Sequence, residues 1–259
     1  MIGGSFNWVF LVMALVGGFL PTFFWLWFWL QEDKKKPEPT HLILKTFIIG
    51  AFFIIPAFLL ERFFAPSADI VNQISLAYQS HEGLFILISL ASPLIAWAII
   101  EEVIKYLGAY VGALRSRFCD EPIDMMVYLI TSALGFAAIE NFLFLLNVLI
   151  SDGLVTSSFL FTGNLRFLGA TLLHIVTSAI FGACLSFAFY RGRFLKLLAW
   201  ILGLFASATL HVLFNFFIIV NEEGDVLRVL IGLWIVAMFV IFLFEVVKRL
   251  TYSKKLPVQ

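Results

Sequence analysis

Long apolar runs separated by short polar segments dominate the chain. A run of about 20 apolar residues is long enough to cross the hydrocarbon core of a bilayer as a helix. Seven runs reach roughly this length, at residues 6–30, 41–60, 84–114, 124–150, 166–190, 197–220 and 228–248. The pattern predicts an all-α, polytopic membrane protein with about seven transmembrane helices.

The composition agrees with a chain that is solvated by lipid. Hydrophobic residues make up 62% of the chain and charged residues 13%, against about 45–50% and about 25% in soluble domains. A soluble protein of 259 residues would need far more charge to cover its surface. The 17 basic and 17 acidic residues cancel, so the net charge gives no reason to expect a nucleic-acid partner.

Basic residues are concentrated in alternate loops. Three of them, Arg62, Arg166 and Arg228, fall on one predicted side of the membrane, and Lys105 falls inside a run. The other thirteen fall on the opposite side: Lys34, Lys35, Lys36, Lys45, Arg115, Arg117, Arg191, Arg193, Lys196, Lys248, Arg249, Lys254 and Lys255. Because cytoplasmic loops are enriched in Lys and Arg, we expect an outside N-terminus and a cytoplasmic C-terminus.

The runs divide the chain into three parts. We expect residues 1–83 to form two transmembrane helices and an outer loop, and residues 84–220 to form a core that carries the intramembrane polar residues. Residues 221–259 would form a last transmembrane helix and a flexible cytoplasmic tail. Apolar residues recur at helical spacing within 70–78. This spacing is also compatible with a short interfacial helix, but we expect an ordered connector.

Ionisable residues inside the apolar runs are the main functional signal. Such groups cost a few kcal/mol each in a transmembrane helix, and they mark functional sites by default. Four consecutive runs contribute these residues and two neighbouring amides: Glu101, Glu102 and Lys105 in the third, Glu140 and Asn141 in the fourth, His174 in the fifth, and His211 and Asn215 in the sixth. At about 1.5 Å per residue, Glu140, His174 and His211 fall near the membrane midplane, so we expect one shared site.

These residue types suit the hydrolysis of an acyl bond by activated water. Adjacent carboxylates such as Glu101 and Glu102 can supply a general base, while Lys105, at helical spacing from both, can neutralise one of them. Two histidines and a carboxylate are also a typical zinc ligand set. The ligands of a Zn2+ ion would be His174, His211, Glu101 and Glu140. An asparagine side chain can stabilise an oxyanion.

Other readings of the same residues remain open. Glu101, Glu102 and Lys105 can form a structural ion pair, and a single intramembrane histidine can be a hydrogen-bonding contact between helices. Buried carboxylate, histidine and lysine groups also serve proton- or ion-coupled transport, although no inverted repeat is visible. A catalytically silent membrane scaffold is a further alternative.

The series of motifs resembles the PrsW family of intramembrane proteases and, more distantly, the type II CAAX prenyl proteases. The resemblance covers roughly residues 85–220, and Gly-Phe-Ala-x-x-Glu-Asn is its most specific part. The motifs are Glu-Glu-x-x-Lys (101–105), Asp-x-x-x-Tyr (124–128), Gly-Phe-Ala-x-x-Glu-Asn (135–141), His174 and His-x-x-x-Asn (211–215). The resemblance implies a helical fold and proteolysis of a single-span membrane protein, such as an anti-sigma factor, in the prokaryotic plasma membrane.

The resemblance also implies an active site. Some members of the family are grouped as metalloproteases, which implies a bound metal ion. We expect Glu101 or Glu102 to activate water, with the second carboxylate or Lys105 adjusting its basicity, and His174 and His211 to bind a metal or position the water. Glu140 and Asn141 would complete the site. Asn215 stands where many relatives have Asp, and it would hold the oxyanion or orient His211.

Overall fold

The computed structural model contains helices and no strands in the residues that it describes, which are 8–31, 36–64, 70–81, 83–152, 166–220 and 226–255. Six helices are long and apolar enough to cross a membrane. They are α1 (Trp8–Leu30), α2 (Thr40–Glu61), α6 (Pro122–Asp152), α8 (Thr171–Phe187), α9 (Arg193–Val220) and α10 (Val226–Lys255). They match six of the seven predicted runs, which confirms an all-α protein with several membrane-crossing helices.

The predicted run at residues 84–114 is broken into three helical pieces. They are α4 (Leu84–Leu90), α5 (Ser92–Ala109) and η3, a π-helical turn (Tyr110–Leu114). Pro93 in the first turn of α5 marks the break, because proline lacks the N–H that a continuing helix would need. The helix α5 also carries three charged residues, and it is not among the six apolar helices.

Smaller differences from the predicted runs lie at helix ends. A second π-helical turn, η4 (Arg166–Ala170), leads into α8. A 3-10 turn, η2 (Arg62–Phe64), follows α2, and the segment at 70–78 is the helix α3 (Ile70–Gln79). The helix α10 continues to Lys255, beyond the end of the predicted run at residue 248.

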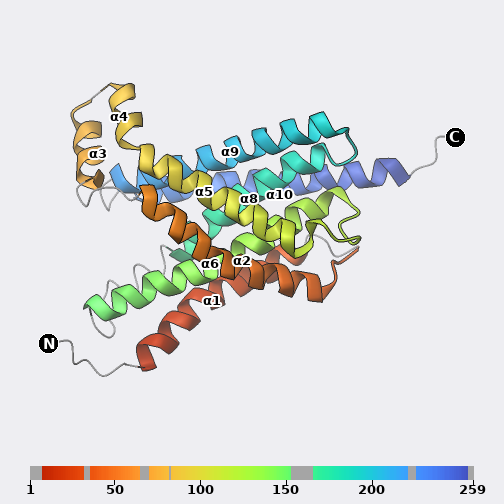
Figure 1. Ribbon diagram of the computed structural model, residues 1–259, viewed down its shortest axis with the longest axis horizontal. Helices are drawn as coiled ribbons and strands as arrows, with labels where there is room; N and C mark the ends of the chain where they lie inside the picture. The colour runs from red at the N-terminus through yellow and green to blue at the C-terminus, as the bar shows by residue number, and fades with distance from the viewer. Residues whose placement is uncertain are drawn as a thin grey trace.

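The helices α6 and α8 form the centre of the bundle. The helix α8 is the most buried of the six apolar helices, followed by α6, whereas at most 22% of the apolar windows of α1, α9 and α10 is buried. Figure 1 shows α8 between α6, α5, α9 and α10, with α1 and α2 against α6. Outward-facing Leu, Ile and Phe side chains cover the outer helices, as expected of surfaces that face lipid.

Small residues let the other helices approach α6 backbone to backbone. A Cβ atom on Gly135 of α6 would overlap the carbonyl oxygen of Phe47 on α2, and one on Gly50 of α2 would overlap the carbonyl of Ser132. A Cβ atom on Gly182 of α8 would lie 2.7 Å from Cα of Met126. In lipid, helices gain little hydrophobic free energy by associating, so close packing of this kind holds them together. These contacts also fix the position and rotation of α6 relative to α2 and α8.

A separate polar cluster anchors the first turn of α6. Oδ2 of the buried Asp124 accepts hydrogen bonds from the backbone N–H groups of Asp120 and Glu121, which satisfies donors at the helix start. The Tyr128 hydroxyl donates to Glu38 in the segment before α2. Lys36 binds Asp120 at 2.7 Å, and this contact raises the pKa of Lys36 to about 12.

Substitution of Gly135 tests the contact between α2 and α6. We expect Gly135→Ala to destabilise the protein by about 1–3 kcal/mol, because the added methyl group forces two backbones apart. Gly232→Ala is the matched control, since a Cβ atom there meets nothing within 4 Å. Thermal unfolding in detergent should show a lower midpoint for Gly135→Ala alone. Equal midpoints for both variants would contradict the close approach.

The thiol of Cys119 should react slowly in the folded protein. Burial, followed by the nearby carboxylates of Asp124, Glu38 and Asp120, raises its pKa to about 12, and only the thiolate is nucleophilic. In a Cys184→Ala background, the rate of maleimide labelling should keep rising up to pH 10 in the folded protein. After unfolding, the same rate should level off above the normal thiol pKa of about 8.5. A plateau near pH 9 in the folded protein would refute this.

Candidate active site

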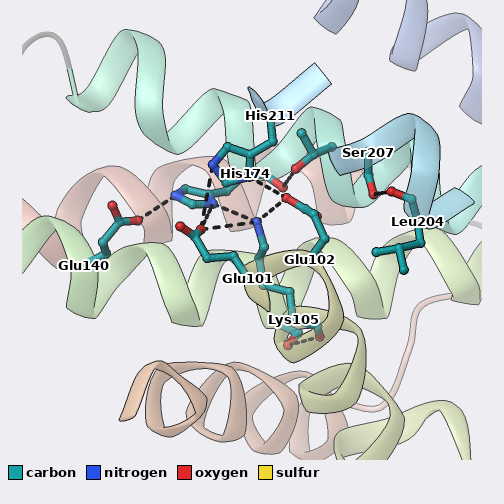
Figure 2. A network of polar contacts seen from close by, with 10 residues as sticks. Glu101, Glu102, Lys105, Glu140, His174, Leu204, Ser207 and His211 are labelled. Carbon is teal, nitrogen blue, oxygen red and sulfur yellow. Dashed lines mark hydrogen bonds and ion pairs between the residues drawn. The ribbon is translucent and has the colours of Figure 1, made fainter. Parts of the chain in front are cut away.

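Six ionisable side chains from four helices meet in one buried cluster. Glu101, Glu102 and Lys105 come from α5, Glu140 from α6, His174 from α8 and His211 from α9. Figure 2 shows all six pointing toward one another, and we call them the carboxylate–histidine cluster. The structure therefore brings together six of the eight residues that the sequence predicts for the site.

Lys105 lies at the centre of this cluster. Its side chain is 1% exposed, and its Nζ atom lies 2.6 Å from Oε1 of Glu102, 3.0 Å from Nδ1 of His174 and 3.9 Å from Oε2 of Glu101. The ring of Phe136 lies 5.7 Å from Nζ, within the range of a cation–π contact. One ammonium group thus links α5 to α8 and faces α6.

The contacts of the two histidines determine which ring nitrogen carries the proton. An ammonium group can only donate, so Nδ1 of His174 accepts from Lys105, and Nε2 donates to Glu140 at 2.7 Å. Nδ1 of His211 donates to Oε1 of Glu102 at 2.8 Å. A neutral His211 therefore has a free lone pair on Nε2, which lies 3.9 Å from Oε2 of Glu101.

The cluster has more carboxylate oxygens than hydrogen-bond donors. Oε2 of Glu101 and Oε2 of Glu102 are both buried, and neither accepts a hydrogen bond within the described part of the chain. Buried oxygens without a donor are rare in native proteins and indicate a missing partner. Glu102 is fully buried and uses Oε1 for two contacts, whereas Glu101 is 14% exposed and directs Oε2 toward both histidines and Lys105.

Part of the cluster has the spacing of a metal site. One ligand atom each from Glu101, Glu140 and His174 lie within 4.8 Å of one another. Histidine and carboxylate ligands are those of catalytic zinc sites, and the unpartnered oxygen of Glu101 is available. The fourth predicted ligand, His211, is not in this group. Because Nε2 of His174 holds a proton for Glu140, a metal would have to replace that proton.

The two asparagines of the predicted site lie beside the cluster. Nδ2 of the fully buried Asn141 donates to Oγ1 of Thr171 at 2.9 Å, which joins α6 to α8. Asn215 is half-buried one turn after His211, and no hydrogen bond recorded in the described ranges joins it to the cluster. Their direct roles in chemistry stay predictions.

The structure gives a role to most residues of the Gly-Phe-Ala-x-x-Glu-Asn motif. Gly135 contacts α2, and Phe136 packs beside His174 and Lys105. Glu140 and Asn141 then bind α8. The Asp-x-x-x-Tyr motif lies at the other end of α6, 16 residues before Glu140 in the sequence, which is about 24 Å along a helix.

Sequence reasoning missed Glu61, which it treated as a loop residue. Glu61 is the last residue of α2, and its carboxylate interacts electrostatically with Glu140, Lys105 and Glu101. Oε1 of Glu61 is buried without a hydrogen-bond donor in the described ranges. Its position directly after an apolar run was a usable signal, but the adjacent Arg62 suggested a solvated loop.

The chain is similar to several known proteins. The sequence profile described as PrsW family intramembrane metalloprotease matches residues 38–244. The Protease PrsW of Geobacillus kaustophilus is 24% identical over 163 residues, which cover 63% of this chain and 59% of that protein. The Protease PrsW of Halalkalibacterium halodurans is 23% identical over 204 residues, covering 78% of this chain and 81% of that protein.

A third relative is matched over a longer segment. The Protease PrsW of Clostridioides difficile is 23% identical over 230 residues, and the match covers 88% of each protein. No solved structure is significantly similar to the chain. The family match at residues 38–244 includes the whole carboxylate–histidine cluster. Together with the six apolar helices, it shows that the chain is an integral membrane protein and belongs to the PrsW family of intramembrane metalloproteases.

Proposed function

We propose that the chain is an endopeptidase that hydrolyses a peptide bond of a membrane-anchored protein by means of activated water. The observation that supports this most directly is the buried Oε2 atom of Glu101, which has no hydrogen-bond donor and faces His174, His211 and Lys105. A water molecule in this position would satisfy the oxygen and be polarised by it. Membership of the PrsW family supports the same activity.

Glu101 is the stronger candidate for the general base. Glu102 is held by Lys105 and His211 through one oxygen, so its charge serves to fix those two groups. Glu101 has a longer contact to Lys105, 3.9 Å, and keeps its oxygen available. In the proposed step, Glu101 takes a proton from water while the water oxygen attacks the carbonyl carbon. The proton then passes to the leaving nitrogen as the C–N bond breaks.

Positively charged and N–H groups of the cluster would stabilise the negative charge that develops on the carbonyl oxygen. The Lys105 ammonium is already in place and desolvated, which increases the strength of such an interaction. The half-buried Asn215 lies one turn from His211 on α9. It would hold the oxyanion or orient the His211 ring.

A metal ion fits the same residues. Glu101, Glu140 and His174 would hold it, with Nε2 of His211 as the next free nitrogen donor. Bound Zn2+ lowers the pKa of a coordinated water and polarises a carbonyl group. Lys105 and Glu102 would then orient the two histidines, and metal binding would release the proton shared between His174 and Glu140.

The proposal includes an orientation and a class of substrate. With α5 counted as a seventh crossing, the N-terminus lies outside and the C-terminus in the cytoplasm, since the thirteen basic residues then face the cytoplasm. The cluster would cut a single-span protein, such as an anti-sigma factor, near the outer half of the plasma membrane of a prokaryote. The bacterial relatives support this location.

Replacement of Glu101 tests the proposed base. In proteoliposomes with a single-span substrate, Glu101→Gln should lower kcat by a factor of about 100 or more, because general-base catalysis contributes about 10²–10⁴-fold. Glu245→Gln is the matched control, since Glu245 is an exposed residue of α10 that pairs with Lys248. New peptide termini, measured by mass spectrometry, give the rate. A Glu101→Gln protein that is as fast as wild type would disprove the mechanism.

Glu102→Gln should differ from Glu101→Gln in stability. Removal of this carboxylate charge leaves the buried Lys105 ammonium without its closest counter-ion, at 2.6 Å, and breaking a buried pair costs about 3–5 kcal/mol. We expect a clearly lower unfolding midpoint in detergent for Glu102→Gln and a nearly unchanged one for Glu101→Gln. The opposite order would assign the structural role to Glu101.

Removal of metal tests the proposed cofactor. Purified protein should contain about one zinc per chain, and a zinc chelator should abolish cleavage until Zn2+ is added back. His174→Ala should lose the metal, while His41→Ala, at an exposed position far along α2 from the cluster, should keep it. Full cleavage in the presence of chelator, with no metal by elemental analysis, would exclude Zn2+ as cofactor.

A further inference from the structure

A groove lies between the end of α2 and the start of α5. Its lining residues are Ile55, Phe58, Leu59, Glu61, Arg62 and Trp97, and its volume is about 570 Å3. This volume is within the roughly 300–1,000 Å3 typical of ligand-binding pockets. Leu59 is 57% exposed, so the groove is open toward the surrounding membrane. We call it the α2–α5 groove.

The helices α2 and α5 pack against each other up to the groove. A Cβ atom on Gly108 of α5 would lie 3.5 Å from Cα of Gly50 in the middle of α2. At the groove, Nε1 of Trp97 donates a hydrogen bond to the carbonyl oxygen of Glu61, at 3.1 Å.

The inner end of the groove adjoins the carboxylate–histidine cluster. Trp97 and Glu101 are four residues apart on α5 and therefore lie on the same face, about 6 Å apart along the helix axis. The Glu61 carboxylate interacts electrostatically with Glu101, Glu140 and Lys105. A molecule that fills the groove would thus lie about one helical turn from Glu101 along α5.

The chemistry of Glu61 decides what can occupy the groove. Its side chain lines the groove, and its Oε1 atom has no hydrogen-bond donor in the described residues. Lipid acyl chains have no N–H or O–H group, so lipid in the groove would leave this carboxylate unsatisfied at a cost of about 1–3 kcal/mol. An extended polypeptide brings a backbone N–H at every second residue on each side, and its side chains can fill the apolar remainder.

We propose that the α2–α5 groove is the lateral entrance through which an extended segment of the substrate reaches the site, and that Glu61 positions this segment by accepting a backbone N–H with its carboxylate. This inference rests on the proposed proteolytic function. Glu61 is a positioning residue in this scheme, because it binds the substrate chain beside the bond that is cleaved. Phe58, Leu59 and Trp97 contact the substrate side chains.

Two substitutions of Glu61 separate hydrogen bonding from charge. Glu61→Leu removes the acceptor, and we expect KM to rise about 5–10-fold with kcat within about 3-fold of wild type, the size of one net hydrogen bond. Glu61→Gln keeps a carbonyl oxygen at the same place, so its KM should be within about 2-fold of the wild-type value. An unchanged KM for Glu61→Leu, or a Glu61→Gln as impaired as Glu61→Leu, would overturn the assignment.

Adjacent leucines on α2 provide a matched pair for the groove itself. Leu59 lines it, whereas Leu60 is 44% exposed and does not. Leu59→Trp should raise KM at least about 5-fold by filling the entrance, and Leu60→Trp should leave KM unchanged. Equal effects of the two substitutions would refute an entrance at this position.

Photo-crosslinking identifies the molecule that occupies the α2–α5 groove without requiring cleavage of the substrate. With the Glu101→Gln protein in nanodiscs, a photoreactive residue at position 59 should capture the single-span substrate, and one at position 60 should capture lipid only. Capture of lipid alone at both positions would overturn the entrance proposal. If position 59 captures substrate but the wild-type protein produces no new termini, the proposed protease function fails while the binding groove stands.

Discussion

One buried ammonium group determines how the four helices of the site must fit together. Lys105 is almost completely shielded from solvent, and its contacts reach Glu102 and His174 directly. Removing one partner of a buried ion pair costs several kcal/mol, because water cannot solvate the charge that remains. Through Glu102 the constraint extends to His211 on α9, and through His174 to Glu140 on α6. Any arrangement of α5, α6, α8 and α9 that separates these groups is therefore strongly disfavoured.

The same network explains why the site combines rigidity with reactivity. Close backbone contacts at Gly50, Gly135 and Gly182 hold α2, α6 and α8 at fixed distances, so the side chains of the cluster have little room to rearrange. Within this frame, Oε2 of Glu101 and Oε2 of Glu102 are left without donors in the described part of the chain. Unsatisfied polar atoms in lipid are costly, so their retention here indicates selection for binding and chemistry over stability.

The sequence predicted the helices and the cluster well, for a physical reason. In lipid, a charged residue inside an apolar run stands out, and counting residues along helices placed Glu140, His174 and His211 at one depth. The break at Pro93 was not predicted, because an apolar run looks continuous on both sides of a single turn residue. Glu61 was missed because its burial depends on how α2 packs against α5, which no local pattern reveals. The hydrogen-bond partners of Asn141 likewise depend on the register between α6 and α8.

The two π-helical turns have a consequence for how such proteins diverge. One follows α5, five residues after Lys105, and the other ends four residues before His174. A π turn accommodates one residue more than an α-helical turn, and it arises when a single residue is inserted into a helix. Both turns therefore allow the helix ends to change length by one residue while the Lys105–His174 pairing keeps its register. An insertion or deletion of one residue at either point would leave the reactive groups in place.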